Sequence, residues 1–255
     1  MSRTKRKNMP TLFALIFFLS GGAALGCQVV WVKACAAILG SEWPAVLAVV
    51  TAFMSGMAIG NFLFMRVLAG GLRWYAALEV VIGLWTWATA WIIPFLDGAI
   101  IPLLGVEPSA PYQWAVVFGA VLLTLVPATT AMGATLPAAE RFLTRTMQSH
   151  TTGLLYGANT AGATMGVMFA AFWMMPALVI RGCLFALGAV SICCGIAGFC
   201  IARSTQKTPV AMEAKSTAGR APLRLGTRLF ICGLLGIGFE VVMIHALAQV
   251  LENTI

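Results

Sequence analysis

Long runs of apolar residues separated by short polar segments dominate this chain. With approximate edges, the runs are 11–39, 43–65, 74–96, 112–139, 153–175, 178–201 and 229–251. Each run approaches or exceeds about 20 residues, the length that an α-helix needs to cross the hydrocarbon core of a bilayer. The pattern therefore predicts an all-α integral membrane protein with seven transmembrane helices.

The composition indicates that lipid, and not water, surrounds most of this chain. Of its 255 residues, 60% are hydrophobic and only 9% are charged, and the mean hydropathy is +0.94. Soluble domains carry roughly 25% charged residues. The deficit is too large for a surface that faces water.

The positions of the charged residues predict the orientation of the helices. When the N-terminus is placed in the cytoplasm, every lysine and arginine except Lys33 and Arg181 falls on the cytoplasmic side. The outer loops then hold Glu42, Asp97, Glu107 and Glu252. This asymmetry is the positive-inside pattern. It predicts a multi-pass protein of the cell (inner) membrane with its N-terminus in the cytoplasm and its C-terminus outside, and it accounts for the net charge of +8 without a nucleic-acid partner.

The sequence of one predicted helix is repeated later in the chain. Residues 19–41 align without gaps on residues 231–253, with polar positions matched as well as apolar ones. The matched pairs are Gly21 with Gly233, Gly26 with Gly238, Gln28 with Glu240, and Lys33 with His245. Six predicted helices precede the second copy, so both copies point the same way, which predicts two parallel halves.

The repeat divides the chain into four parts. We expect a basic cytoplasmic N-terminus at 1–10, a six-helix bundle at 11–201, a basic cytoplasmic linker at 202–228, and the first helix of a second, incomplete repeat at 229–255. Two six-helix bundles joined by a cytoplasmic linker form the major facilitator architecture. The chain resembles one such half followed by the first helix of the other.

Four motifs resemble the membrane-embedded spermidine-synthase-like family, whose members are described as fused major-facilitator and spermidine-synthase proteins. They are FFLSGGAALGCQVVWVKACAAILGS at 17–41, YAALE at 75–79, PATTAMGATLP at 127–137 and GLLYGANTAG at 153–162. The resemblance covers about residues 11–251, the transmembrane part of the family. It departs from the family pattern at Gln28, where a glutamate is usual, and at Lys33, where an arginine is usual.

The resemblance does not extend to an enzyme domain. The chain has no hydrophilic stretch long enough to fold an aminopropyltransferase, so we expect no catalytic residues, no cofactor and no synthase activity from it alone. The seven cysteines lie in apolar segments without metal-ligand spacing, and we interpret them as small buried residues.

Polar side chains inside apolar helices are candidate site residues, because an unpaired polar group in hydrocarbon is costly. The candidates for a substrate or proton pathway are Glu79, Gln28, Lys33, Asn159, Glu240 and His245. Glu79 fits a cation site and a buried structural hydrogen bond equally well. For Lys33 we favour a side chain that snorkels to the membrane interface. For Asn159 we favour a role in helix packing.

Two arginines are candidates for a cytoplasmic gate in the facilitator interpretation. They are Arg66 and Arg73, which flank the short segment between the second and third predicted helices. The simpler interpretation is that both arginines only set the orientation of the helices in the membrane, and we favour it.

These features predict a transporter-type membrane module. The family resemblance implies polyamines or related cationic metabolites as cargo, and a second membrane chain or another copy would supply the missing helices. Two alternatives stay open: a non-catalytic scaffold that holds a separate soluble synthase-like enzyme through the linker 202–228, and an inactive fragment of a longer fused protein.

Overall fold

The computed structural model describes residues 9–67, 71–105, 109–146 and 150–205, together with scattered positions between 227 and 242. Its elements are α2 (Met9–Leu39), α3 (Glu42–Val67), α4 (Leu72–Leu104), α5 (Ala110–Thr146), α6 (His150–Phe169), the π-helix η1 (Ala170–Met174) and α7 (Met175–Thr205). The chain divides into two units after Gln206, and the fold below is that of the first. Most of the linker and of the seventh predicted helix lies outside the described residues, so the seven-helix architecture stays a prediction.

Five helical segments are long and apolar enough to cross a membrane. They are Thr11–Leu39, Glu42–Phe64, Leu72–Leu104, Pro111–Glu140 and Gly153–Arg203. The all-helical class and the apolar, multi-helix character are therefore confirmed for the described part of the chain.

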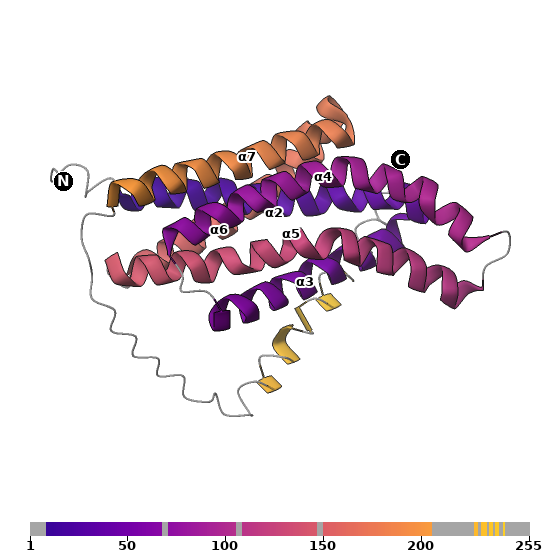
Figure 1. Cartoon of the computed structure of the whole chain (residues 1–255), viewed down its shortest axis with the longest axis horizontal. Helices are drawn as coiled ribbons and strands as arrows, with labels where there is room; N and C mark the ends of the chain where they lie inside the picture. Colours follow the sequence, from indigo (N-terminus) through magenta and orange to yellow (C-terminus); the bar gives the residue numbers. More distant parts are fainter. Residues whose placement is uncertain are drawn as a thin grey trace. The chain divides into compact units, whose positions relative to one another are not determined.

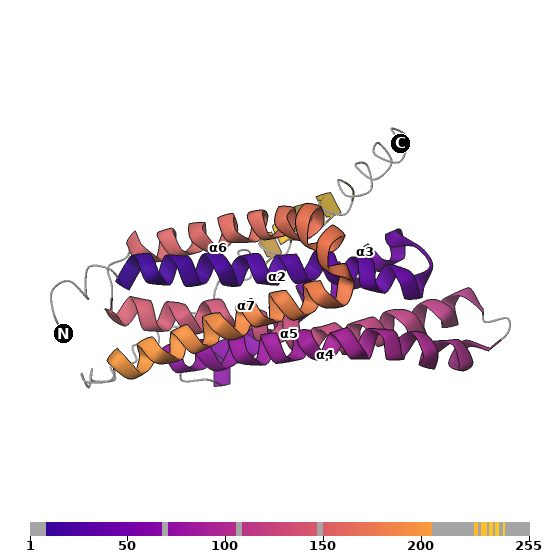
Figure 2. The same ribbon diagram turned by 90° about the horizontal axis from the view of Figure 1, so that it is seen from above.

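The fifth segment folds back on itself. It has 51 residues, which as a straight helix would extend about 75 Å, far beyond the thickness of a bilayer. The helix breaks at Val179, whose backbone angles are φ 58° and ψ 164°. Figure 2 shows α6 and α7 as two helices joined by this bend.

Contacts between helices show that their directions alternate. Side-chain contacts join Ser20 to Glu79, Cys27 to Thr86 and Trp31 to Thr89. Because residue numbers rise together on both helices, α2 and α4 run parallel. The helix between them in the sequence, α3, therefore runs in the opposite direction. On α4 and α7 the numbers run in opposite senses, since Gly83 lies against Gly188 while Ala76 lies against Gly195.

The helices pack most extensively in three pairs: α2 with α6, α3 with α5, and α4 with α7 (Figure 1). Glycines allow the close approach. A Cβ atom on Gly162 of α6 would collide with the backbone of Phe18 on α2, and one on Gly60 of α3 would collide with the backbone of Thr130 on α5. The G-x-x-x-G spacings Gly56–Gly60 on α3 and Gly162–Gly166 on α6 are thus packing motifs. The spacing Gly153–Gly157 is not, because a Cβ there meets no described atom within 4 Å.

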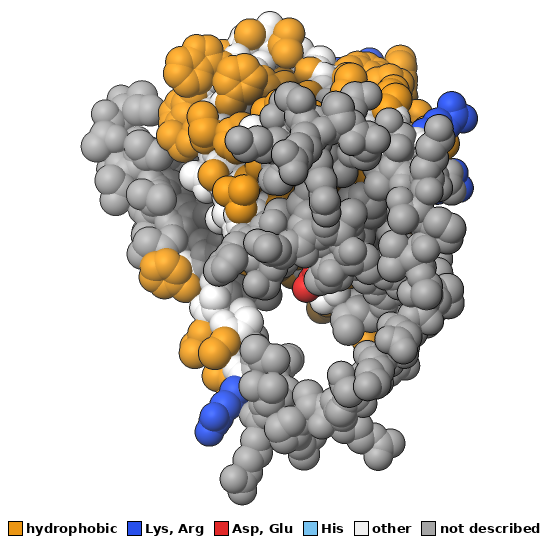
Figure 3. All heavy atoms as spheres, turned by 90° about the vertical axis from the view of Figure 1, so that its left-hand side faces the viewer, with side chains coloured by type: hydrophobic (Ala, Val, Ile, Leu, Met, Phe, Trp, Pro, Cys, Tyr) orange, Lys and Arg blue, Asp and Glu red, His pale blue; other side chains and the backbone are white. Residues whose placement is uncertain are grey.

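Charged side chains mark the two ends of the bundle. Arg73 begins α4 and Arg203 ends α7, and these termini are neighbours because Tyr75 lies beside Gly198. Figure 3 looks onto this end and shows basic side chains at the edge of the described surface and an acidic side chain nearer the middle. At the other end, Lys33 and Glu42 form an ion pair where α2 passes into α3. Charges of both signs lie at both ends, because Glu140 lies near the end of α5 on the side of Arg73, so the orientation of the bundle in a membrane stays a prediction.

Candidate functional site

A buried carboxylate, Glu79, lies two turns into α4. Its side chain is only 1% exposed. Ser20 on α2 donates a hydrogen bond to Glu79 Oε1 over 2.5 Å, and the hydroxyls of Tyr75 and Ser191 lie close to the same carboxylate. Hydroxyls from α2, α4 and α7 therefore surround this one acidic group.

Tyr75 lies one turn before Glu79 on the same face of α4. Its ring stacks on Phe17 of α2, with 5.3 Å between the ring centroids and 9° between the planes. The tyrosine hydroxyl is buried near Ser20 and Glu79, yet its geometry completes no hydrogen bond with a described residue. Buried hydroxyls almost always have a partner, and the nearest groups available to this one are Ser20 and Glu79.

Glu79 and Tyr75 line a cavity of about 400 Å³. Side chains of all six α-helices contribute to its wall, among them Phe53 on α3, Met132 on α5 and Tyr156 on α6. No lysine, arginine or histidine of the described chain is among the lining residues, and Glu79 is their only acid. Within the described part of the chain, the carboxylate thus faces a mostly apolar space without a basic partner.

A second cavity of about 340 Å³ adjoins the first. Phe17, Leu136 and Tyr156 line both cavities. The second cavity also reaches Glu140 near the end of α5 and Gly153 near the start of α6. Together the two cavities lead from Glu79 toward the end of the bundle where the basic residues gather.

Asn159 is the predicted candidate that the structure brings together with Glu79. It lines the same cavity from α6. It also packs tightly on α2, because a Cβ on Gly21 would lie 2.8 Å from Asn159 Oδ1 and closer still to its backbone oxygen. Asn159 therefore serves helix packing while it contributes a polar group to the cavity wall.

The two candidates on α2 lie apart from this cavity. Gln28 is buried one turn beyond Ala24 on the same face of α2, outside the residues that line the cavity. Lys33 is exposed and pairs with Glu42 at the opposite end from Arg73. These two residues are not brought to Glu79.

The remaining candidates are only partly visible. Arg73 is exposed in the first turn of α4. The side chain of Arg66, and the whole of Glu240 and His245, lie outside the described residues.

Sequence reasoning missed Ser20, Tyr75 and Ser191. A signal for Tyr75 was present, because a spacing of four residues on a helix places it directly beside Glu79. Ser20 and Ser191 had no comparable signal, since each reaches Glu79 only through packing between helices.

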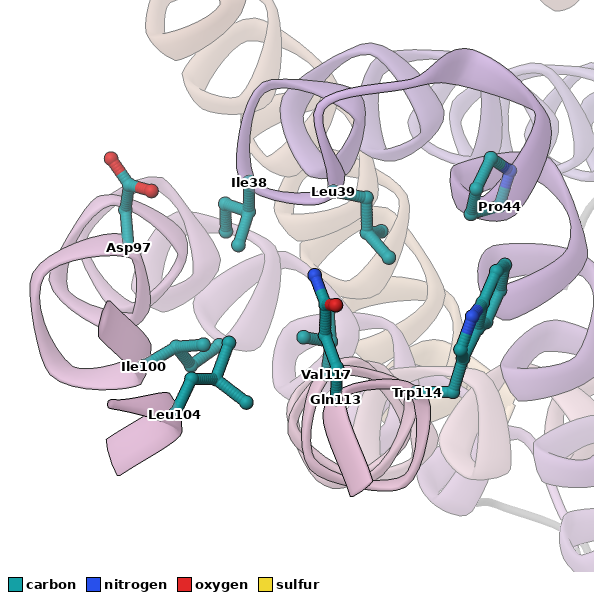
Figure 4. Close-up of a pocket in the computed structure, with 9 residues that line it drawn as sticks. All are labelled: Ile38, Leu39, Pro44, Asp97, Ile100, Leu104, Gln113, Trp114 and Val117. Atoms are coloured by element: carbon teal, nitrogen blue, oxygen red, sulfur yellow. The ribbon is translucent and has the colours of Figure 1, made fainter. Parts of the chain in front are cut away.

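A smaller pocket of about 150 Å³ lies near the other end of the bundle, where α2, α3, α4 and α5 meet. Figure 4 shows that Asp97 points its carboxylate away from the remaining lining residues, while the Gln113 amide points toward Leu39. The two polar groups do not converge, and the described residues contain no cluster of three or more His, Cys, Asp or Glu side chains that could hold a metal ion.

The chain matches no family model, no curated protein and no solved structure. The likeness to the spermidine-synthase-like family therefore rests on the four motifs alone. The function must be argued from the cavity itself.

Proposed function

We propose that this chain is a transporter-type membrane module that binds a cationic solute beside Glu79. The observation that carries the proposal is a buried carboxylate on a cavity whose described lining residues include no basic side chain. A carboxylate in an apolar environment is stabilised by a nearby positive charge, and its burial without one is costly. Here a solute or a proton would supply that charge, while the adjoining cavity provides a route toward one end of the bundle.

The helix pairing supports a facilitator-like half. The first three helices can be matched in order to the last three: α2 to α5, α3 to α6 and α4 to α7. When matched helices are exchanged, the α2–α6 pair becomes the α5–α3 pair, and the α4–α7 pair stays the same. All three pairs are the extensive ones. Nested inverted repeats of three helices have this relation in facilitator halves. The G-x-x-x-G spacings at Gly56–Gly60 and Gly162–Gly166 lie on the exchanged helices α3 and α6.

The orientation and partners of the module follow from the sequence. The basic end would face the cytoplasm in the inner membrane. The repeat at 231–253 suggests that a second bundle pairs with this one, from a second membrane chain or another copy. Polyamines or related cationic metabolites are the cargo that the family resemblance implies. The scaffold alternative depends on the linker 202–228, and no described residue favours it over transport.

Exchange of labelled cations by reconstituted protein tests the proposal. Proteoliposomes containing the full chain would be assayed with spermidine, putrescine and simple monoamines. We expect exchange of at least one cation above empty liposomes, loss of that exchange in Glu79→Gln, and no loss in Glu42→Gln, because Glu42 is exposed and remote from the cavity. A folded protein that exchanges none of these cations, or equal exchange by the Glu79→Gln variant, would overturn the proposal.

A further inference from the structure

We infer that the cavity around Glu79 takes an organic cation with one positive charge and an apolar, aromatic body, in preference to a linear polyamine. This inference rests on the function proposed above and specifies its cargo. The evidence comes from the charges, the aromatic wall and the shape of the cavity.

The charges of the cavity match one ammonium group. Glu79 is the only acidic residue among the described residues that line it. A second or third ammonium group of a polyamine would meet only neutral lining residues, Asn159 and Thr135 among them, and no second carboxylate, which is unfavourable. Glu140 lines the adjoining cavity but is exposed, so water screens its attraction for a second cation.

The wall beside the carboxylate is aromatic. The stacked rings of Phe17 and Tyr75 lie next to Glu79, and Tyr156 lines the cavity from α6. Faces of aromatic rings attract cations, and this is how many sites bind organic ammonium groups. The Tyr75 hydroxyl lies near Glu79, and its oxygen can accept a hydrogen bond from a protonated amine that is held by this carboxylate.

The rest of the cavity is shaped for an apolar body. Its volume of about 400 Å³ lies within the range of small-molecule sites, roughly 300–1,000 Å³. Met54, Met57 and Met132 line it. Methionine side chains are flexible and polarisable, and they adapt to ligands of different shape. We therefore expect the site to accept several aromatic monoamines.

Competition binding to the purified full chain in lipid nanodiscs tests this inference. The probe is tritiated 2-phenylethylammonium, measured by scintillation proximity. The competitors are unlabelled spermidine and propylbenzene, which has nearly the shape of the probe but carries no charge. We expect saturable binding, with each competitor at least about tenfold weaker than the unlabelled probe, a difference of about 1.4 kcal/mol.

Two variants locate the probe. Glu79→Gln should weaken binding at least about tenfold because it removes the charge partner, whereas Glu42→Gln should leave binding unchanged, because Glu42 is exposed and lines neither cavity. The competition with unmodified protein needs no variant, so the inference remains testable if Glu79→Gln does not fold.

The possible results separate this inference from the function on which it rests. Tighter binding of spermidine than of the monoamine would overturn the inference and leave the proposed transport function intact. Equal competition by propylbenzene, or full binding to folded Glu79→Gln, would also overturn the inference, since charge would then play no part. Absence of binding for every cation would overturn the proposed function together with it.

Discussion

Ser20 on α2 donates a hydrogen bond of 2.5 Å to Oε1 of Glu79 on α4. This contact joins two parallel helices that are connected through α3, and it fixes the carboxylate at the edge of the cavity. A hydrogen bond to a carboxylate is stronger than one between neutral groups. The pair is therefore both a packing contact and part of the candidate site.

Ser20→Ala should destabilise the protein by about 1.5–3 kcal/mol, because a partly buried hydrogen bond to a carboxylate is lost. Thermal unfolding in detergent, followed by tryptophan fluorescence, measures the effect. Ser55→Ala is the matched control: among the described residues, the Ser55 hydroxyl bonds to the carbonyls of Thr51 and Ala52 in its own helix, and its removal should change stability by less than about 0.5 kcal/mol. Equal effects of the two substitutions would show that the contact with Glu79 is not special.

Gly162→Ala should separate α6 from α2. The added Cβ would collide with the backbone of Phe18, which cannot move aside as a flexible side chain can. Overpacking of this kind costs about 1–3 kcal/mol, and the midpoint of thermal unfolding should fall accordingly.

Gly157→Ala on the same helix provides the control for this prediction. No described atom lies within 4 Å of a Cβ at that position. Alanine is a better helix former than glycine by about 1 kcal/mol, so this variant should be as stable as the native chain or more so. A loss of stability as large as that of Gly162→Ala would show that α6 packs through a different face.

The helices of the bundle could be predicted from the sequence because hydropathy alone determines where they lie. The apolar run 43–65 became α3 at Glu42–Val67, and the gap between 175 and 178 falls beside the break at Val179. Long apolar runs leave few alternatives, since backbone groups in hydrocarbon must form helical hydrogen bonds. The same argument does not reach the seventh run, which lies outside the described residues.

The candidate site could be predicted only in part. Glu79 was recognisable because an acidic residue in an apolar helix is rare. The same rule selected Gln28 and Lys33 as candidates, yet Lys33 pairs with the exposed Glu42 at the end of the bundle. Whether a polar residue faces the interior cavity depends on the rotation of each helix against its neighbours. That rotation is set by close contacts such as Gly21 with Asn159, which a single sequence does not reveal.

Cysteine labelling tests the orientation of the bundle in the membrane. With a membrane-impermeant maleimide on intact cells, Ser41→Cys and Ser109→Cys should react from outside, while Ser204→Cys in the last turn of α7 should react only after permeabilisation. The exposed native cysteines would first be replaced by alanine, and they are Cys193, Cys200 and Cys232. The positive-inside pattern gives this result. The reverse labelling pattern would place the N-terminus outside, and labelling of all three positions from one side would exclude the alternating helix directions.

Val179→Gly should stabilise the bend between α6 and α7. Val179 is the only described residue other than glycine with a positive φ, at 58°, and a β-branched side chain in that region is strained by about 1–2 kcal/mol. Its side chain is 73% exposed, so little packing is lost on removal. After allowance for the greater freedom of glycine in the unfolded chain, we expect a gain of up to about 1 kcal/mol in the free energy of unfolding, measured by thermal unfolding in detergent.

Val81→Gly, at a half-exposed position within α4, is the control and should lower the free energy of unfolding, because glycine weakens a regular helix by about 1 kcal/mol. If both substitutions lowered stability alike, the bend at Val179 would not carry the strain that its backbone angles imply.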